Sequence, residues 1–178
     1  MTTQYGVKTP FLLLLLIFIA SVSKSQTANN FKLVSSAFQE GKPIPAKYTC
    51  DSVNVSPPLS WSGSPEKTKS FAIIMDDPDA PMGTWVHWVI YNIPGTLTSL
   101  EEKKGAADIK AIDGLNSWYE KEYNGPCPPG GTHQYIFKLY ALDKTLTPKE
   151  RMDKDELLEA MKGHILGETT LTGLFRVE

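Results

Sequence analysis

Two short, proline-rich segments of this chain are each followed by a histidine. The first, residues 76–81, contains three aspartates and precedes His87, and the second, residues 126–131, ends in two glycines and precedes His133. Because proline fixes φ and lacks a backbone N–H, both segments should adopt few conformations. Two rigid loops that each lead into a strand with a histidine near its start could form one small polar pocket at the end of a sheet.

The side chains of these segments suit the binding of a small anion, such as a phosphate or carboxylate group. Histidine can change its charge near neutral pH, and a carboxylate from Asp77 or Asp79 would favour the imidazolium form and fix the tautomer. Tyr135 offers a hydroxyl, and glycine N–H groups can approach an anion closely. The predicted pocket contains Asp77, Asp79, His87, His133, Tyr135 and the Gly130–Gly131 backbone, with Trp85, Trp88, Pro128 and Pro129 as an apolar rim.

Each of these residues also has a purely structural explanation. Aspartate next to proline is common in turns, because its side chain caps its own backbone. A single histidine on a strand is more often a satisfied structural group than a ligand-binding one, and tryptophans such as Trp85 and Trp88 are more often core residues than a surface on which a ligand stacks. The pocket is favoured by the combination, since two rigid loops each supply a histidine.

Two other kinds of site would use the same residues. Cys127 and His133 could act as nucleophile and base of a hydrolase, if the thiol is free and near the pocket. His87, His133 and Asp77 are residue types that bind zinc, but their spacing matches no compact zinc motif. We expect neither, because no nucleophile and base have a recognisable orienting partner. The sequence therefore predicts a non-catalytic protein without a metal or cofactor.

The N-terminal region has the pattern of a secretory signal peptide. Lys8 precedes an apolar run at residues 11–20, and small residues follow it. The run is too short to cross a bilayer comfortably, which favours a cleaved signal over an uncleaved anchor. We predict a signal peptide at residues 1–25, a polar tail at 26–30 and a domain at 31–178 that is exported to the periplasm or secreted.

Cys50 and Cys127 are the only two cysteines in the chain. An exported compartment permits a disulfide, and both residues lie beside proline-containing loops. A disulfide between two cysteines this far apart in the chain would raise the free energy of unfolding by roughly 4–5 kcal/mol on the chain-entropy model. We expect the disulfide, and the alternative is two separate buried thiols.

The hydrophobic pattern predicts one domain with a mainly antiparallel β fold. Residues 70–75 form an almost continuous apolar run, typical of a central strand buried on both faces. Residues 85–93 and 133–142 should also be strands, and simple alternation places His87 on the same face as Val89. The formal charge of −2, without a basic stripe, argues against a nucleic-acid partner.

The other elements are expected to be shorter or later in the chain. A capping-box-like start at Asp153 predicts a helix to about His164, with Leu157, Leu158, Met161 and Ile165 as its apolar stripe. The remaining predictions are strands at 31–34, 48–50 and 169–177, an extended segment at 56–61, a turn at 41–45 and loops over 99–125.

A series of motifs runs in order from about residue 31 to the C-terminus. They include Tyr48-Thr49-Cys50-Asp51, Asp77-Pro78-Asp79-Ala80-Pro81, Trp85-Val86-His87-Trp88, Pro128-Pro129-Gly130-Gly131-Thr132-His133-Gln134-Tyr135 and Leu139-Tyr140-Ala141-Leu142-Asp143. Together they resemble the phosphatidylethanolamine-binding protein family, in particular its bacterial, Raf-kinase-inhibitor-like branch.

This resemblance implies a β-sandwich-like fold with a large central sheet, a smaller second sheet and one or two peripheral helices. Gln134 stands where animal members have an arginine, so a fixed positive charge is not expected there. The C-terminal helix that covers the pocket in animal members is not expected either, as in the bacterial branch, which is associated with dimers. The implied anion pocket is built by Asp77, His87, Pro128, His133 and Tyr135, with Asp79 beside it.

We therefore expect an exported, non-catalytic binding protein. Its ligand would be a small anion or a phospholipid headgroup, and it could modulate a protein partner or form a homodimer. The alternative in another class is a protease-inhibitor-like interaction protein, as some family members are, although no reactive loop is identifiable in the sequence.

Overall fold

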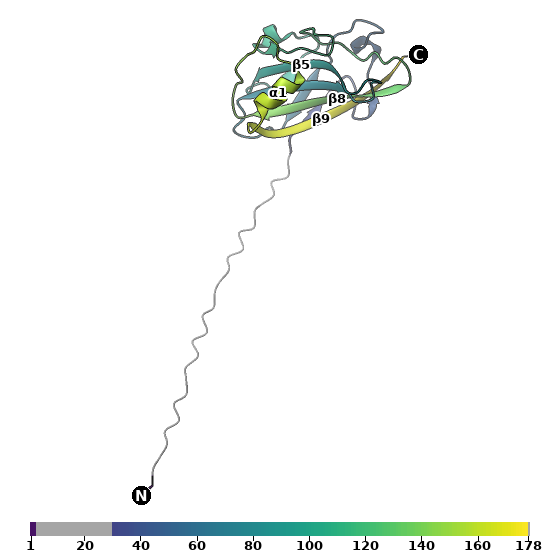
Figure 1. Cartoon of the computed structure of the whole chain (residues 1–178). Coiled ribbons are helices and arrows are strands. Elements are labelled where there is room, and N and C mark those ends of the chain that lie inside the picture. The colour runs from purple at the N-terminus through teal and green to yellow at the C-terminus, as the bar shows by residue number, and fades with distance from the viewer. Residues whose placement is uncertain (3–29, 178) are drawn as a thin grey trace.

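The computed structural model describes residues 1–2 and 30–177 of the chain. Residues 3–25 of the predicted signal peptide and residues 26–29 of the polar tail lie outside these residues. Within them, no helix is both long and apolar enough to cross a lipid bilayer. The described domain consists of two β-sheets and one α-helix (Figure 1).

The two sheets differ in size, as the family resemblance implies. The small sheet has the order β1-β3-β6 and the large sheet the order β2-β9-β8-β4-β5-β7. All pairings are antiparallel except that of β2 with β9. The strands are β1 Lys32–Val34, β2 Lys42–Pro43, β3 Leu59–Ser62, β4 Ser70–Asp77, β5 Trp85–Pro94, β6 Ser99–Leu100, β7 Ile112–Asp113, β8 Thr132–Leu142 and β9 Ile165–Arg176.

Strand β4 lies at the centre of the large sheet and is buried on both faces, as its continuous apolar run predicts. One face packs against the small sheet, where Phe71 and Ile73 join Leu33 and Trp61 in a single hydrophobic core. Burial of both faces leaves β4 little freedom to shift register, because a slip would move its side chains to the wrong face. Asp77, at its end, is therefore held by a rigid strand.

Helix α1 (Lys154–Met161) lies across the other face of the large sheet, over β5 and β8 (Figure 1). Leu157 and Met161 point into a second core that includes Ile74 and Val89. The helix begins where the sequence predicts, because the Asp153 side chain accepts a hydrogen bond from the third residue of the helix. The chain leaves the helix earlier than expected and enters β9 at Ile165.

Strand β5 departs from simple alternation, and this changes the prediction for His87. Two irregularities interrupt its pairing with β4, one between the partners of Met75 and Asp76. As a result Val89 packs in the core beneath α1, whereas the His87 ring packs against Tyr135, which belongs to the core between the sheets. The expectation that His87 and Val89 share a face is wrong, because a bulge adds a residue to one strand.

Several short elements also differ from the sequence-based expectations. The predicted strand at 48–50 is instead a 3₁₀ helix, η1 (Ala46–Tyr48), followed by turns. The predicted turn at 41–45 contains β2, whose proline is tolerated because the strand lies at the sheet edge. The segment 99–125, expected to be loops, contains β6, β7 and a second 3₁₀ helix, η2 (Ala106–Ile109).

The structure joins Cys50 and Cys127 in a disulfide, as expected from the sequence. The Cα atoms are 5.4 Å apart, and the residues are separated by 77 positions in the chain. The neighbouring backbone adds a hydrogen bond from Cys50 N–H to the Pro126 carbonyl. The bridge thus fastens the proline-rich loop before β8 to the segment that follows η1.

Candidate functional site

Asp77 lies at the centre of the predicted pocket residues. It is the last residue of β4, where it pairs with Trp85 of β5, and it is only 3% exposed. Its Oδ2 lies 2.8 Å from Nδ1 of His133, and its Oδ1 accepts a 2.9 Å hydrogen bond from the backbone N–H of Asp79. One carboxylate therefore contacts a histidine of β8 and also fixes the turn that leaves β4.

His133 is held by the strand as well as by this carboxylate. It lies near the start of β8, pairs with Phe175 of β9 and is buried. Because a carboxylate accepts hydrogen bonds, Nδ1 carries the hydrogen in the contact with Asp77. Nε2 is the ring nitrogen that takes no part in this contact.

His87 is fixed in a similar way by a backbone carbonyl. Its Nδ1 donates a 2.7 Å hydrogen bond to the Asn124 carbonyl, and Nε2 takes no part in this bond. Burial lowers the pKa of His87, while the Asn124 carbonyl and the Asp77 carboxylate act in the opposite direction. In the free protein the ring thus has an increased preference for the neutral form.

Tyr135 packs against His87 and lies close to the Asp77 carboxylate. Its ring centroid is 5.2 Å from that of His87, in an edge-to-face arrangement, and the residue is fully buried. Burial raises the pKa of Tyr135, and the negative charge of Asp77 raises it further. Among the described residues, none forms a hydrogen bond of ordinary geometry with this hydroxyl, although the Asp77 carboxylate and the Cys127 backbone lie close enough to interact with it. Most buried polar groups in proteins have a partner, so this hydroxyl requires an explanation.

The remaining predicted pocket residues differ in their positions. The Asp79 carboxylate accepts a 2.8 Å hydrogen bond from the Gln134 N–H and so connects the turn after β4 to β8. Pro128 is buried, whereas Pro129 and the two following glycines are exposed. The backbone of Cys127 lies close enough to Tyr135 to influence the pKa of its hydroxyl. The loop that carries Pro128 is thus brought beside the site.

The aromatic wall of the site is made by a different pair of tryptophans from the one predicted. Trp85 is partly exposed and packs edge-to-face on Trp118, whose ring also contacts His87, with centroid separations of 5.3 and 5.1 Å. Trp88 is instead buried in the core, where it packs on Tyr123. Trp88 therefore follows the structural explanation rather than the prediction of an apolar rim.

Sequence reasoning missed the segment that supplies Trp118 and Asn124. Both come from the long polar stretch between β7 and β8 that was expected to be a loop. Asn116 organises this stretch, since its Oδ1 accepts hydrogen bonds from the N–H groups of Trp118 and Glu120. The adjacent aromatic residues 118–119 in a polar segment were the one sequence signal that could have indicated a contact with the site.

Two alternative kinds of site receive no support from this arrangement. Cys127 is bonded to Cys50, so its sulfur is not available as a thiolate nucleophile in the disulfide-bonded protein. Across residues 30–177, no group of three or more histidine, cysteine, aspartate or glutamate side chains could hold a metal ion. The geometry instead places two histidines and a tyrosine around one buried carboxylate.

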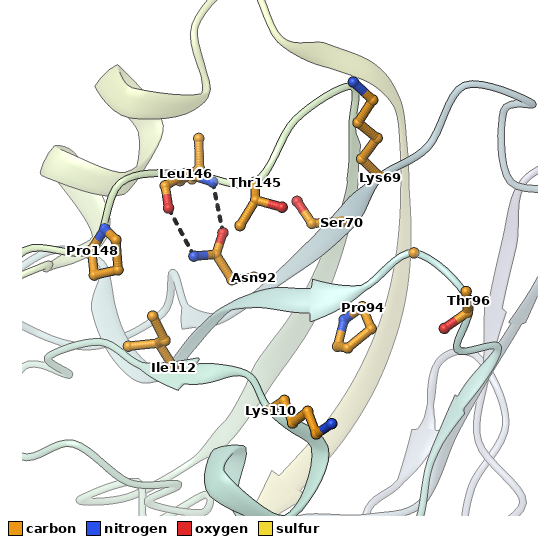
Figure 2. A pocket seen from close by; sticks show the side chains of 11 residues that line it. Lys69, Ser70, Asn92, Pro94, Thr96, Lys110, Ile112, Thr145, Leu146 and Pro148 are labelled. Carbon is orange, nitrogen blue, oxygen red and sulfur yellow. Dashed lines mark hydrogen bonds between the residues drawn. The ribbon is translucent and has the colours of Figure 1, made fainter.

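A cavity of about 530 Å³ lies at the opposite end of β4 and β5, away from this cluster. Figure 2 shows Asn92 in this cavity, with its side-chain amide hydrogen-bonded to both the carbonyl and the N–H of Leu146. Ser70, also in its lining, donates to the Lys144 carbonyl. The buried polar groups here are already satisfied, in contrast to the hydroxyl of Tyr135.

Comparisons with known proteins agree with this fold. Residues 34–176 match the family described as phosphatidylethanolamine-binding protein. A UPF0098 protein of Methanothermobacter thermautotrophicus is 50% identical over 147 residues, which cover 81% of this chain and 97% of the relative. A UPF0098 protein of Chlamydia trachomatis is 44% identical over 149 residues, with the same coverage of both chains.

Two solved structures resemble this one closely. A homologue of phosphatidylethanolamine-binding proteins from Chlamydia trachomatis is 42% identical, with a TM-score of 0.80 over 85% of this chain and all of the other. The YbcL protein of E. coli, described as a member of the mammalian family, is 31% identical, with a TM-score of 0.76 over 84% of this chain and 99% of the other. The chain therefore belongs to the phosphatidylethanolamine-binding protein family.

Proposed function

We propose that the cluster around Asp77 binds a small oxyanion, a phosphate or carboxylate group, either free or as part of a phospholipid headgroup. The observation that supports this most strongly is the buried Tyr135 hydroxyl, which forms no hydrogen bond of ordinary geometry with a described residue. Leaving such a group unsatisfied costs about 1–3 kcal/mol. A ligand oxygen that accepts its hydrogen would remove this cost and would explain why a tyrosine occupies the position.

The two histidines supply ring nitrogens that the anion can contact. Their Nδ1 atoms are occupied by Asn124 and Asp77, which leaves both Nε2 atoms for the ligand. A neutral imidazole with hydrogen on Nδ1 can only accept at Nε2. The anion is therefore bound with uptake of a proton, because imidazolium donates at Nε2 and offsets the negative charge of Asp77.

The family description supports a phospholipid headgroup as one source of this anion. We also propose that the protein is exported and acts without catalysis. Support for export comes from the apolar N-terminal run of the sequence and from the Cys50–Cys127 disulfide, since disulfides persist mainly in oxidising compartments. Both cysteines are exposed and would meet reductants in a cytosol.

Calorimetric titration of histidine variants tests the proposal. His87→Ala and His133→Ala should each weaken the binding of inorganic phosphate and of glycerophosphoethanolamine by about 1.5–3 kcal/mol, the value of a hydrogen bond to a charged group. His164→Ala is the matched control, because His164 also contacts an aspartate through Nδ1, at 2.9 Å, but lies between α1 and β9. It should bind as the wild type does.

Wild-type affinity in both site variants, with cooperative thermal unfolding retained, would contradict the proposal. The two ligands distinguish the two sources of the anion, a free oxyanion and a phospholipid headgroup. Tighter binding of glycerophosphoethanolamine would favour a lipid headgroup, whereas equal binding would favour a free oxyanion.

A further inference from the structure

The rings of Tyr135, His87 and Trp118 form a continuous series that leads from the interior of the proposed anion site to the surface. Tyr135 is fully buried, His87 is 3% exposed and Trp118 is 41% exposed. The His87 ring centroid lies 5.2 Å from that of Tyr135 and 5.1 Å from that of Trp118, edge to face in both cases. A substituent on an oxyanion held by Tyr135 and His87 has to extend toward solvent, and Trp118 is the partly exposed ring next to His87.

The backbone around Trp118 is fixed directly beside the histidine. Val86, which precedes His87 on β5, donates its N–H to the Ser117 hydroxyl, and its carbonyl accepts a hydrogen bond from the Ser117 N–H. The Trp118 N–H is bonded in turn to Oδ1 of Asn116. The indole is therefore presented by an ordered loop before any ligand binds, which reduces the entropic cost of binding.

Packing within the protein explains only part of this position. Trp118 contacts the rings of His87 and Trp85, and these contacts account for the covered part of the indole. A partly exposed tryptophan elsewhere on the surface would need no further explanation. This one adjoins the ring that we propose contacts the anion, so its exposed part is available to whatever group the anion carries.

The charged groups near this wall are acidic. The Asp79 carboxylate accepts a hydrogen bond from the Gln134 N–H, and that of Glu120 accepts one from the side chain of Asn124, whose carbonyl holds His87. Neither acid forms an ion pair within residues 30–177. Both therefore disfavour a second negative group on the ligand. They would also attract an ammonium group, which is the rival substituent.

We propose that the ligand of this site carries an aromatic ring next to its oxyanion, as in an aryl phosphate, and that Trp118 selects for this ring. The inference rests on the proposed anion site and names the class of compound that the site takes. Two aromatic rings in stacked or edge-to-face contact gain roughly two- to tenfold in affinity beyond the area that they bury. An aliphatic ring of the same size covers the indole without this gain.

Calorimetric titration with phenyl phosphate and cyclohexyl phosphate tests the inference, at a pH where both esters are dianions. The two compounds share the anionic group and have rings of similar size, but only the first ring is aromatic. Phenyl phosphate should bind the wild type roughly two- to tenfold more tightly. Trp118→Leu should remove this preference, and Trp118→Phe should retain it. The ratio of the two affinities cancels any effect of the substitutions on the phosphate contacts.

Tyr119→Leu is the matched control. The neighbouring Tyr119 is 76% exposed, and its ring packs on no other aromatic ring among the described residues. This variant should keep the wild-type ratio, and loss of the preference here would assign the effect to the wrong ring.

A wild-type ratio near one, or the full preference in Trp118→Leu, would overturn the inference. Tighter binding of phosphoethanolamine than of phenyl phosphate would also overturn it, because the acidic groups and not the indole would then select the substituent. In these cases inorganic phosphate still binds, and the proposed anion site stands. Absence of binding by inorganic phosphate and by every ester would instead overturn both proposals.

Discussion

Asp77 and His133, 56 positions apart in the chain, are joined by a 2.8 Å contact between Oδ2 and Nδ1. Their side chains are only 4% and 8% exposed. The chain also contains a second aspartate–histidine contact of nearly the same length, between Asp143 and His164, but there the side chains are 42% and 37% exposed. The same pair of residue types therefore occurs once buried at the candidate site and once near the surface.

This difference predicts unequal effects of removing the two carboxylate charges. Asp77→Asn should lower the free energy of unfolding by about 1.5–3 kcal/mol. The substitution weakens both the buried contact with His133 and the hydrogen bond from the Asp79 N–H. Asp143→Asn should lower it by about 0–1 kcal/mol, as is usual for solvent-exposed pairs. Urea denaturation of both variants at neutral pH provides the comparison. Equal losses would show that the buried contact contributes nothing particular to stability.

The pH dependence of anion binding follows from the lowered pKa of His87. A bound anion favours imidazolium and raises this pKa, so the complex holds more protons than the free protein. Affinity should therefore increase as the pH falls from above the pKa of the complex toward the lowered pKa of free His87. Sulfate is the suitable probe, because it does not titrate in this range.

As the pH falls, the lowered pKa of His87 makes the free protein less stable, whereas anion binding becomes tighter. Unfolded His87 has the ordinary pKa of about 6.5 and takes up a proton first as the pH falls. This residue therefore reduces stability below that pH, until folded His87 is protonated as well. His87→Gln should weaken the pH dependence of both the sulfate affinity and the free energy of unfolding. Sulfate affinity that rises with pH would contradict the account.

The disulfide should contribute strongly to stability. On the chain-entropy model, closing a loop of this length is worth about 4–5 kcal/mol, which Cys50→Ala combined with Cys127→Ala would remove. Because the bridge fastens the loop that contains Pro128, the double variant should also bind phosphate more weakly at temperatures where it remains folded. Guanidinium denaturation and calorimetry measure the two effects. An unchanged denaturation midpoint would show that the bridge is dispensable.

The local features of this fold could be predicted from the sequence. The apolar run of β4, the Asp153 cap of α1 and the histidines that follow two rigid loops all depend on neighbouring residues. The disulfide could also be expected, because the chain contains a single pair of cysteines. Each of these features needs only residue type and local spacing.

Features that depend on distant partners could not be predicted in the same way. The bulge that turns His87 toward Tyr135 arises from the register between β4 and β5, which alternation along one strand does not contain. Trp118 reaches the site from a polar segment whose position is set by Asn116. Strand β2 is defined by its pairing with β9. Its two residues are too few to show a hydrophobic pattern in the sequence.

The most direct test of the central claim compares two buried tyrosines. Tyr135 and Tyr91 are both fully buried, and neither hydroxyl forms a hydrogen bond of ordinary geometry with a described residue. The nearest polar groups are Asp77 and the Cys127 backbone for Tyr135, and the Lys149 backbone for Tyr91. Tyr91 lies in the core beneath α1, away from the histidines, and so provides a matched control. Replacing either by phenylalanine removes one unsatisfied oxygen and should leave stability unchanged or slightly increased.

Only Tyr135→Phe should weaken the binding of phosphate. Calorimetry with inorganic phosphate should show a loss of about 1.5–3 kcal/mol of binding free energy for Tyr135→Phe and wild-type affinity for Tyr91→Phe. Wild-type phosphate affinity in Tyr135→Phe, or the same loss in both variants, would contradict the proposal that the Tyr135 hydroxyl is kept free for an anion.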